Sequence, residues 1–124
     1  MKQVLFVLFL FSFSFISFQG LAQESVKIQE IGLEIMKNDL VEMRWDEAIK
    51  ACANLGDGWR LPTKDELKEI CYIKDKVVGL RNGTYWSSTE NSTSTAWTVN
   101  FGGGCYTTNQ YKTVSYYVRA VRDL

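Results

Sequence analysis

The sequence predicts an α+β fold, because two segments with helical periodicity come early and several short segments with strand-like alternation come late. Apolar residues recur every three or four positions over residues 45–55, and a helix-start signal stands at Thr63. After Gly79 the apolar residues alternate instead. The sequence lacks the repeated strand–helix–strand pattern that would indicate a parallel sheet. We therefore expect two helices flanking short antiparallel strands.

Residues 1–22 are typical of a cleavable signal peptide. Lys2 precedes an apolar run over residues 4–18, and the small residues Gly20 and Ala22 precede the expected cleavage before Gln23. The run is shorter than the roughly 20 apolar residues that span a bilayer, which argues against a membrane anchor. We expect an exported protein, in the periplasm, on the cell surface or secreted, with residues 23–124 forming a single domain without a membrane span.

The expected mature chain has almost balanced charge, with 13 basic and 14 acidic residues, because Lys2 is the only charged residue of the signal. The chain lacks the excess of positive charge that would indicate nucleic acid as a partner. The composition is that of an ordinary domain, whose length suffices to bury a hydrophobic core.

Two helices are predicted after one or two short strands within residues 26–36 and a turn at residues 38–39. The first helix has one apolar stripe and ends at Gly56, a residue that tolerates the left-handed cap conformation. The second begins at Thr63, where Thr63 and Glu66 form a capping box, and ends near Lys74. The residues expected to face inward are Trp45, Ala48, Ile49, Cys52 and Leu55 in the first helix and Leu67, Ile70 and Cys71 in the second.

Strands are predicted over residues 85–88, 96–101, 105–108 and 114–121, with a polar loop over residues 90–95. Alternation places Trp97, Val99 and Phe101 on one face of the second of these strands. We expect Trp86 and Trp97 to lie in the core, because large buried aromatic side chains supply much of a small domain's stability.

Three cysteines, Cys52, Cys71 and Cys105, lie in the expected mature chain. In an oxidising compartment one pair can form a disulfide and leave an odd thiol. A Cys71–Cys105 bridge would contribute about 3 to 4 kcal/mol in the chain-entropy model. We expect Cys52 to be a small buried residue, and the pairing itself is left open.

Several motifs follow one another along the chain: Trp45-Asp46-Glu47-Ala48 with Cys52, the segments at residues 55–67, 85–90 and 96–97, and Tyr117-Val118-Arg119-Ala120-Val121-Arg122. In this order and spacing they resemble the Lcl C-terminal domain family, and in particular its major paralogous domain subgroup. The resemblance spans residues 32–122. It implies a C-type-lectin-like fold with paired N- and C-terminal strands, on secreted or surface proteins. One relative is the end domain of a bacterial collagen-like adhesin that binds sulfated glycans.

The chain departs from this family pattern at Ala120, where members often have a cysteine. In those members the cysteine forms a disulfide with the first helix. Cys52 cannot form this disulfide, because Ala120 has no thiol. The calcium-binding signatures of C-type lectins are also absent, so we do not expect sugar binding through calcium by that route.

We expect neither catalysis nor a cofactor or metal. The sequence contains no histidine, which removes the commonest general base and the commonest zinc ligand. Ser87-Ser88-Thr89-Glu90 combines hydroxyls with a carboxylate, but a strand end whose hydroxyls cap the next loop explains it better.

The candidate ligand-binding residues are Tyr106, Tyr111, Asn91 and Arg60. Exposed aromatic rings can stack on sugars, and the polar loop around Asn91 offers hydrogen bonds to hydroxyls. Arg60 can clamp an anion, although an internal ion pair with Asp57 or Glu66 that fixes the loop explains it better.

A locally basic stretch, interspersed with acids, consists of Lys64, Lys68, Lys74, Lys76 and Arg81. We expect a non-enzymatic binding module for a glycan or a surface protein. The alternatives are a structural or assembly component of the cell surface and a divergent enzyme.

Overall fold

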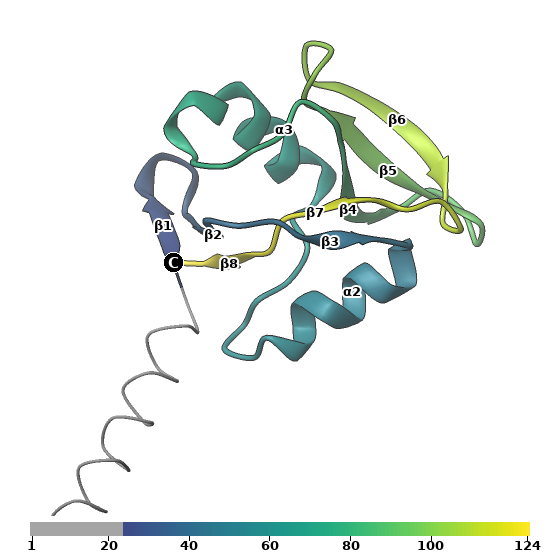
Figure 1. The fold of residues 1–124 in the computed structure, drawn as a ribbon, viewed down its shortest axis with the longest axis horizontal. Helices are drawn as coiled ribbons and strands as arrows, with labels where there is room; N and C mark the ends of the chain where they lie inside the picture. Colours follow the sequence, from purple (N-terminus) through teal and green to yellow (C-terminus); the bar gives the residue numbers. More distant parts are fainter. Residues whose placement is uncertain (1–23) are drawn as a thin grey trace, which may run out of the picture.

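The computed structural model describes residues 24–124, whose strands form two sheets (Figure 1). The smaller sheet has the strand order β1-β2-β8 and the larger the order β3-β7-β4-β5-β6. The strands are β1 (Ser25–Ile28), β2 (Leu33–Met36), β3 (Leu40–Met43), β4 (Thr84–Glu90), β5 (Thr95–Asn100), β6 (Tyr106–Tyr111), β7 (Tyr116–Val118) and β8 (Val121–Asp123). The predicted signal peptide, residues 1–22, lies outside the described residues.

Two α-helices flank the larger sheet on opposite sides, α3 (Lys64–Tyr72) above it and α2 (Trp45–Asn54) below it in Figure 1. Short 3-10 helices, η1 (Gln29–Ile31) and η2 (Lys74–Lys76), complete the elements. This arrangement confirms the predicted α+β class. Within residues 24–124, neither helix has the length and hydrophobicity that a membrane span requires.

The smaller sheet joins the N-terminal and C-terminal strands, although the first strand, β1, does not pair directly with the last, β8, because β2 lies between them. β2 pairs antiparallel with β8, with Leu33 opposite Asp123 and Ile35 opposite Val121. In the larger sheet one pair is parallel, since Tyr85 of β4 lies beside Tyr117 of β7. The C-type-lectin-like assignment stays an expectation from the family resemblance.

Both helices begin close to the predicted positions. The Thr63 hydroxyl accepts a hydrogen bond from the Glu66 backbone N–H at 3.2 Å, and the Glu66 carboxylate accepts one from the Thr63 N–H at 2.8 Å. This reciprocal box satisfies two backbone donors that a helix start leaves unpaired. The first helix ends before Gly56, which has the positive φ of 73° that favours glycine.

The single last strand predicted over residues 114–121 is wrong. The chain leaves β7 after Val118, enters β8 at Val121, and changes sheets between them. Arg119 and Ala120 at this crossing are both buried. A buried guanidinium needs hydrogen-bond partners that a regular strand does not offer, so the strand breaks where those partners lie.

β3 was not predicted, because its four residues are too few to show alternation after the turn at residues 38–39. It pairs with β7, with Leu40 opposite Val118, and its register shifts before Met43. β6 continues to Tyr111, beyond the predicted strand at residues 105–108, because its pairing with β5 is regular throughout.

Two buried clusters fill the space between the helices and the sheets. In the first cluster, α3 packs against β5 and against residues of β2, β4 and β8. This cluster contains Leu33, Ile35, Leu67, Ile70, Tyr85, Val99, Phe101 and Val121. α2 packs on the other face of the larger sheet in the second, which contains Trp45, Ala48, Cys52, Trp59, Leu61, Trp86, Ala96, Val118 and Ala120. Cys52 and Ala120 therefore share one cluster, at the positions where the family pattern places a disulfide.

The expectation that Trp97 lies in the core is wrong, whereas Trp86 is fully buried. Trp97 does share a face of β5 with Val99, as predicted, but it is only partly buried and belongs to neither cluster. α3 covers this face over Val99 and begins at Lys64, whose ammonium lies above the Trp97 ring. The alternation of β5 shows which face Trp97 occupies but not where the covering helix begins.

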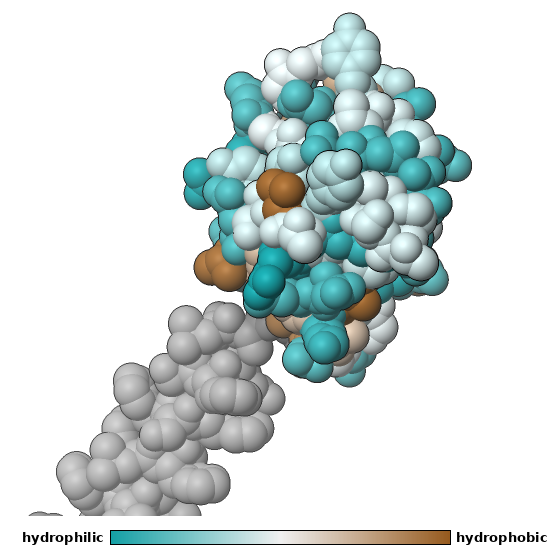
Figure 2. Space-filling model, turned by 90° about the vertical axis from the view of Figure 1, so that its right-hand side faces the viewer, coloured by the Kyte–Doolittle hydropathy of each residue, from teal (hydrophilic) through white to brown (hydrophobic). Residues whose placement is uncertain are grey.

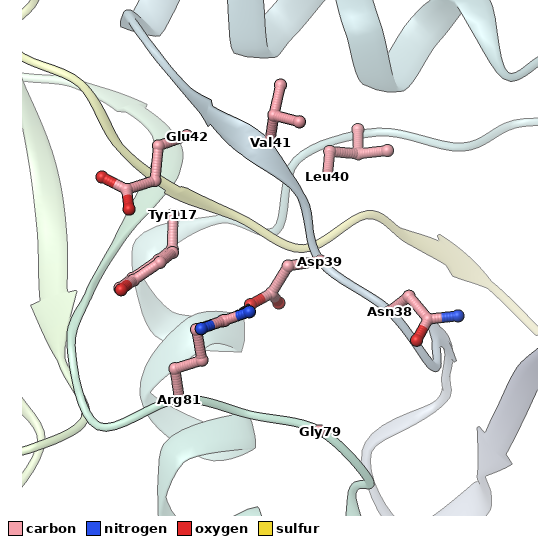
Figure 3. Close-up of a pocket in the computed structure, with 8 residues that line it drawn as sticks. All are labelled: Asn38, Asp39, Leu40, Val41, Glu42, Gly79, Arg81 and Tyr117. Atoms are coloured by element: carbon pink, nitrogen blue, oxygen red, sulfur yellow. Dashed lines mark ion pairs between the residues drawn. The ribbon is translucent and has the colours of Figure 1, made fainter.

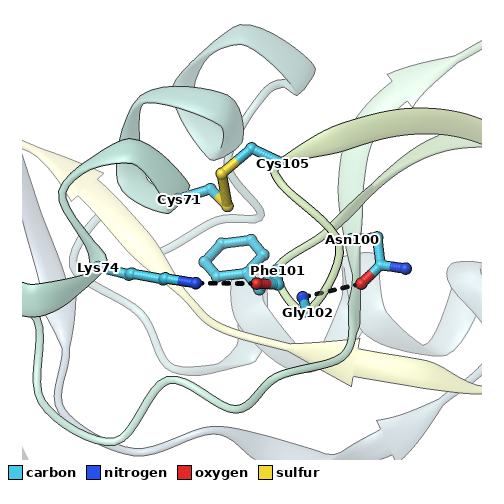
Figure 4. The surroundings of a disulfide bond; sticks show 6 residues. All are labelled: Cys71, Lys74, Asn100, Phe101, Gly102 and Cys105. Carbon is cyan, nitrogen blue, oxygen red and sulfur yellow. Dashed lines mark hydrogen bonds between the residues drawn. A yellow bond between two sulfur atoms is a disulfide. The ribbon is translucent and has the colours of Figure 1, made fainter.

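A disulfide joins Cys71 near the end of α3 to Cys105, the residue before β6 (Figure 4). Beside it, Lys74 donates to the carbonyl of Phe101 at 3.1 Å and the Gly102 N–H donates to the Asn100 side chain at 2.9 Å. The disulfide therefore ties the β5–β6 turn to α3 and Lys74 ties it to η2, whereas the Asn100 bond holds the turn itself. Cys52 is free and buried, as expected.

We predict that replacing Cys71 and Cys105 together by serine lowers the free energy of unfolding by about 4 kcal/mol, because the bridge closes a loop of 34 residues. Urea denaturation of both proteins measures the difference. Cys52→Ala is the matched control that removes a thiol without a crosslink. Equal stability with and without the bridge would contradict the prediction.

Candidate functional site

A shallow hollow of about 580 Å³ lies between β3 and the segment that precedes β4 (Figure 3). Its lining residues are Asn38, Asp39, Leu40, Val41, Glu42, Gly79, Arg81 and Tyr117. Figure 3 shows the Arg81 guanidinium beside the Asp39 carboxylate, with the Tyr117 ring next to them. A concave surface with convergent polar groups is the first place to look for a ligand.

The polar groups at the base of this hollow already bind one another. Asp39 accepts from Arg119 at 2.7 Å and from the Tyr85 hydroxyl at 2.8 Å, and the Arg81 guanidinium lies 3.5 Å from the same carboxylate. The other donors of Arg119 reach the carbonyls of Met36, Val78 and Gly79 at 2.8–3.0 Å. Burial raises the pKa of the Tyr85 hydroxyl, which keeps it a neutral donor. We therefore assign this cluster to folding.

We predict that Asp39→Ala lowers the free energy of unfolding by about 3 to 5 kcal/mol, because the Arg119 side chain is 0% exposed and would keep an unpaired charge in the core. Arg81→Ala is the matched control, since Arg81 pairs with the same carboxylate but is 66% exposed, and its loss should cost at most about 1 kcal/mol. Urea denaturation measures both. Similar small losses in both variants would contradict a structural role for Asp39.

A second surface lies on the α3 side of β5 and β6, beyond the start of the helix. In the register of these strands Trp97 lies opposite Asn109, and Thr95 lies opposite Tyr111. Residues directly opposite each other share a face, so all four side chains project from the same side of the sheet. Trp97 and Tyr111 are diagonal neighbours, with backbones about 7 to 8 Å apart. We call these four residues with Lys64 the Trp97 platform.

The platform combines aromatic surface with polar and charged groups. Tyr111 is 66% exposed, and Asn109 is exposed beside the partly buried Trp97. The Lys64 ammonium lies 4.4 Å from the centre of the Trp97 ring. A cation–π contact at an accessible site contributes only about 0.5 to 1 kcal/mol, so an anionic ligand group can draw Lys64 away and uncover the ring.

The structure brings two of the four predicted site residues to one end of the sheet. Asn91 and Tyr111 lie together there, because Asn91 bonds to Thr95 at 3.0–3.1 Å and Thr95 pairs with Tyr111. Tyr106 lies at the other end of β6, about 17 Å along the strand, and projects from the opposite face. One sugar ring cannot contact both tyrosines.

The fourth predicted residue, Arg60, lies apart from the platform and is held by acids. Its guanidinium donates to both oxygens of Glu66 at 2.7 and 2.9 Å and to Asp123 at 2.7 Å. Glu66 is one of the two internal partners that the sequence suggested. The Arg60 hydrogen bonds hold the pKa of Glu66 below its usual value of 4.5 and raise the pKa of Arg60. Arg60 thereby ties the start of α3 to β8.

This pair predicts a loss of stability in acid. A carboxyl with a depressed pKa stabilises the folded state above about pH 4.5, and this stabilisation is lost as the pH falls through the depressed pKa. We expect the free energy of unfolding to decrease below about pH 4.5, and to decrease less steeply in Arg60→Met. Urea denaturation at a series of pH values measures both slopes. Parallel slopes would show that the ion pair does not lower the pKa of Glu66.

Cys52 and Ser87, the first serine of the segment that combines hydroxyls with a carboxylate, both have structural surroundings. Cys52 is 0% exposed, and burial raises the pKa of its thiol to about 12, so it stays protonated. Ser87 is buried and donates to the Trp97 carbonyl at 2.7 Å. Within residues 24–124, no group of three or more histidine, cysteine, aspartate or glutamate side chains is placed to hold a metal ion.

Sequence reasoning missed Trp97 and Asn109 as candidate site residues, whereas Thr95 belongs to the polar loop that it singled out. Trp97 was assigned to the core, and Asn109 stood outside every motif. The signal that would have found Asn109 is its place in Tyr106–Tyr111, a segment without charged residues between two exposed tyrosines. Their shared face follows only from the register of β5 and β6.

Comparison of the sequence with known proteins identifies the family of the chain. The model of the Lcl C-terminal domain matches residues 23–122, which is nearly all of the chain that the structure describes. No curated protein matches the chain. The motifs that suggested this family from the sequence form the two helix starts, the buried Trp86 strand and the crossing at Arg119. The chain belongs to the Lcl C-terminal domain family.

Proposed function

We propose that this protein is a non-enzymatic, extracytoplasmic binding module whose Trp97 platform binds a glycan. The observation that carries the proposal is the position of Trp97 and Tyr111 as diagonal neighbours on one face, with Asn109 and Lys64 beside them. Aromatic faces pack against the apolar faces of sugar rings, while amide and ammonium groups bond hydroxyls or anionic substituents.

The surface character supports a polar ligand. Figure 2 shows the side of the molecule that lies to the right in Figure 1, and its hydrophobic residues are isolated among hydrophilic and intermediate ones. A broad apolar patch would instead favour a tightly packed protein partner.

Export is supported by two features that are independent of each other. Residues 1–22 have the pattern of a cleavable signal. The Cys71–Cys105 disulfide is of the kind that persists in oxidising compartments and is rare in the cytosol. A binding role without catalysis is supported by the lack of histidine in the sequence and by the buried, protonated Cys52.

The test is binding of the exported protein to a panel of neutral and sulfated glycans at low and high salt. Binding that survives high salt indicates stacking and hydrogen bonds, whereas binding that vanishes indicates charge alone, with Lys64 as its source on the platform. No binding to any glycan would contradict the proposal and favour a surface protein or an assembly role.

We predict that Trp97→Ala and Tyr111→Ala each weaken glycan affinity about tenfold or more, equal to about 1.4 kcal/mol or more. Tyr106→Ala is the matched control, because Tyr106 is 67% exposed and Tyr111 66%, yet Tyr106 projects from the opposite face. Calorimetric titration with a glycan that binds the unaltered protein measures all three. Equal losses in the two tyrosine variants would place binding elsewhere.

A further inference from the structure

β6 is an edge strand of the larger sheet, and no other strand of residues 24–124 pairs with its outer edge (Figure 1). Its six residues pair with β5 without a register shift. The Lys112 N–H donates to the Ser94 carbonyl at 2.9 Å, and the Thr108 carbonyl accepts from the Thr98 hydroxyl at 3.0 Å. Even-numbered backbone groups of β6 therefore point toward β5.

The odd-numbered backbone groups point outward, because N–H and C=O directions alternate along an antiparallel strand. Thr107 and Asn109 each present an N–H and a C=O that have no partner among residues 24–124, and Tyr111 presents its N–H. The Tyr111 carbonyl accepts from Val114 at 3.1 Å and has a second lone pair. An edge with such a row of free groups is a template for another strand.

The usual protections of an edge strand are missing from β6. It contains no charged residue and no proline, and its pairing has no bulge. The opposite edge strand, β3, has both a register shift and the exposed Glu42, and β1 at the edge of the smaller sheet contains Lys27. The protection of β3 and β1 indicates that the unprotected edge of β6 serves to pair with another strand.

We propose that two copies of this protein pair through β6, antiparallel about a two-fold axis at Asn109. Charge favours a second copy, because two identical neutral strands do not repel each other. The axis places Asn109 opposite Asn109 of the other copy, and Thr107 opposite Tyr111, so every outward group meets an outward group. The two sheets then form one continuous ten-stranded sheet.

The pairing enlarges the Trp97 platform, because a two-fold axis perpendicular to the sheet keeps both platforms on the same side. Trp97 lies opposite Asn109, so the two Trp97 residues are separated by three strand spacings, about 14 Å. The two Tyr111 residues lie on opposite sides of the line between them, each about 7 Å away along its own strand. The joint surface suits an extended polymer chain better than a single sugar. The dimer itself does not depend on glycan binding, and its test contains no glycan.

The contact is small. A six-residue edge buries less than the about 800 Å² per partner that stable complexes bury, so the dimer depends on protein concentration. Sedimentation velocity of the exported protein from low to high micromolar concentration should show a reversible increase from monomer to dimer. A chain that stays monomeric at the highest concentration overturns the proposal.

Asn109 provides a charge test of the register, because it faces itself across the axis. Asn109→Lys and Asn109→Asp should each weaken self-association about tenfold or more, since like charges then face each other. An equimolar mixture of the two variants should associate again as a heterodimer. Glu42→Lys on β3 is the control and should dimerise like the unaltered chain.

Two outcomes contradict this register. Both variants could dimerise as the unaltered chain does, or the mixture could stay monomeric although each variant is folded by circular dichroism. Asn109 is exposed and its backbone groups point away from β5, so neither variant disturbs a bond within the sheet. If Glu42→Lys alone abolishes association, the interface lies on β3 and the proposal is overturned.

Discussion

The two-sheet arrangement depends on the ion pair and the hydrogen bonds of the Arg119 guanidinium. This group is buried at the crossing from β7 to β8 and bonds Asp39 together with the carbonyls of Met36, Val78 and Gly79. A buried cation requires these partners, because an unsatisfied one costs several kcal/mol. The end of β2, the turn before β3 and the segment before β4 are therefore held in a single arrangement around one side chain.

This arrangement decides which surfaces the helices cover. α2 and α3 pack on opposite faces of the larger sheet, and the disulfide and Arg60 hold the two ends of α3. α3 has nine residues and a length of about 14 Å, whereas the six residues of β5 extend about 20 Å. The helix begins at Lys64 above Trp97, and the sheet beyond it stays open as the Trp97 platform.

The platform and the free edge share β6, which connects the two proposals physically. Thr107, Asn109 and Tyr111 present side chains on the platform face and backbone groups at the outer edge. A neutral strand of tyrosine, threonine, asparagine and glutamine suits both roles, because it offers hydrogen bonds without charge repulsion between copies. Under these two proposals, pairing through β6 repeats the binding site along a polymer, and linked sites raise the effective concentration of each other.

The sequence by itself determined what depends on neighbouring residues: the two helices, the Thr63–Glu66 box, the buried Trp86 and Cys52, and the family through its linked motifs. Those features follow from periodicity and capping, which act over a few positions. It left β3 out, joined β7 to β8 and placed Trp97 in the core. Only the tertiary structure decided that Arg119 breaks the last strand, that Asn91 and Tyr111 meet while Tyr106 and Arg60 lie elsewhere, and that Trp97 lies beyond the helix. Each of these depends on strand register or on partners distant in the chain, and local periodicity carries no information about either.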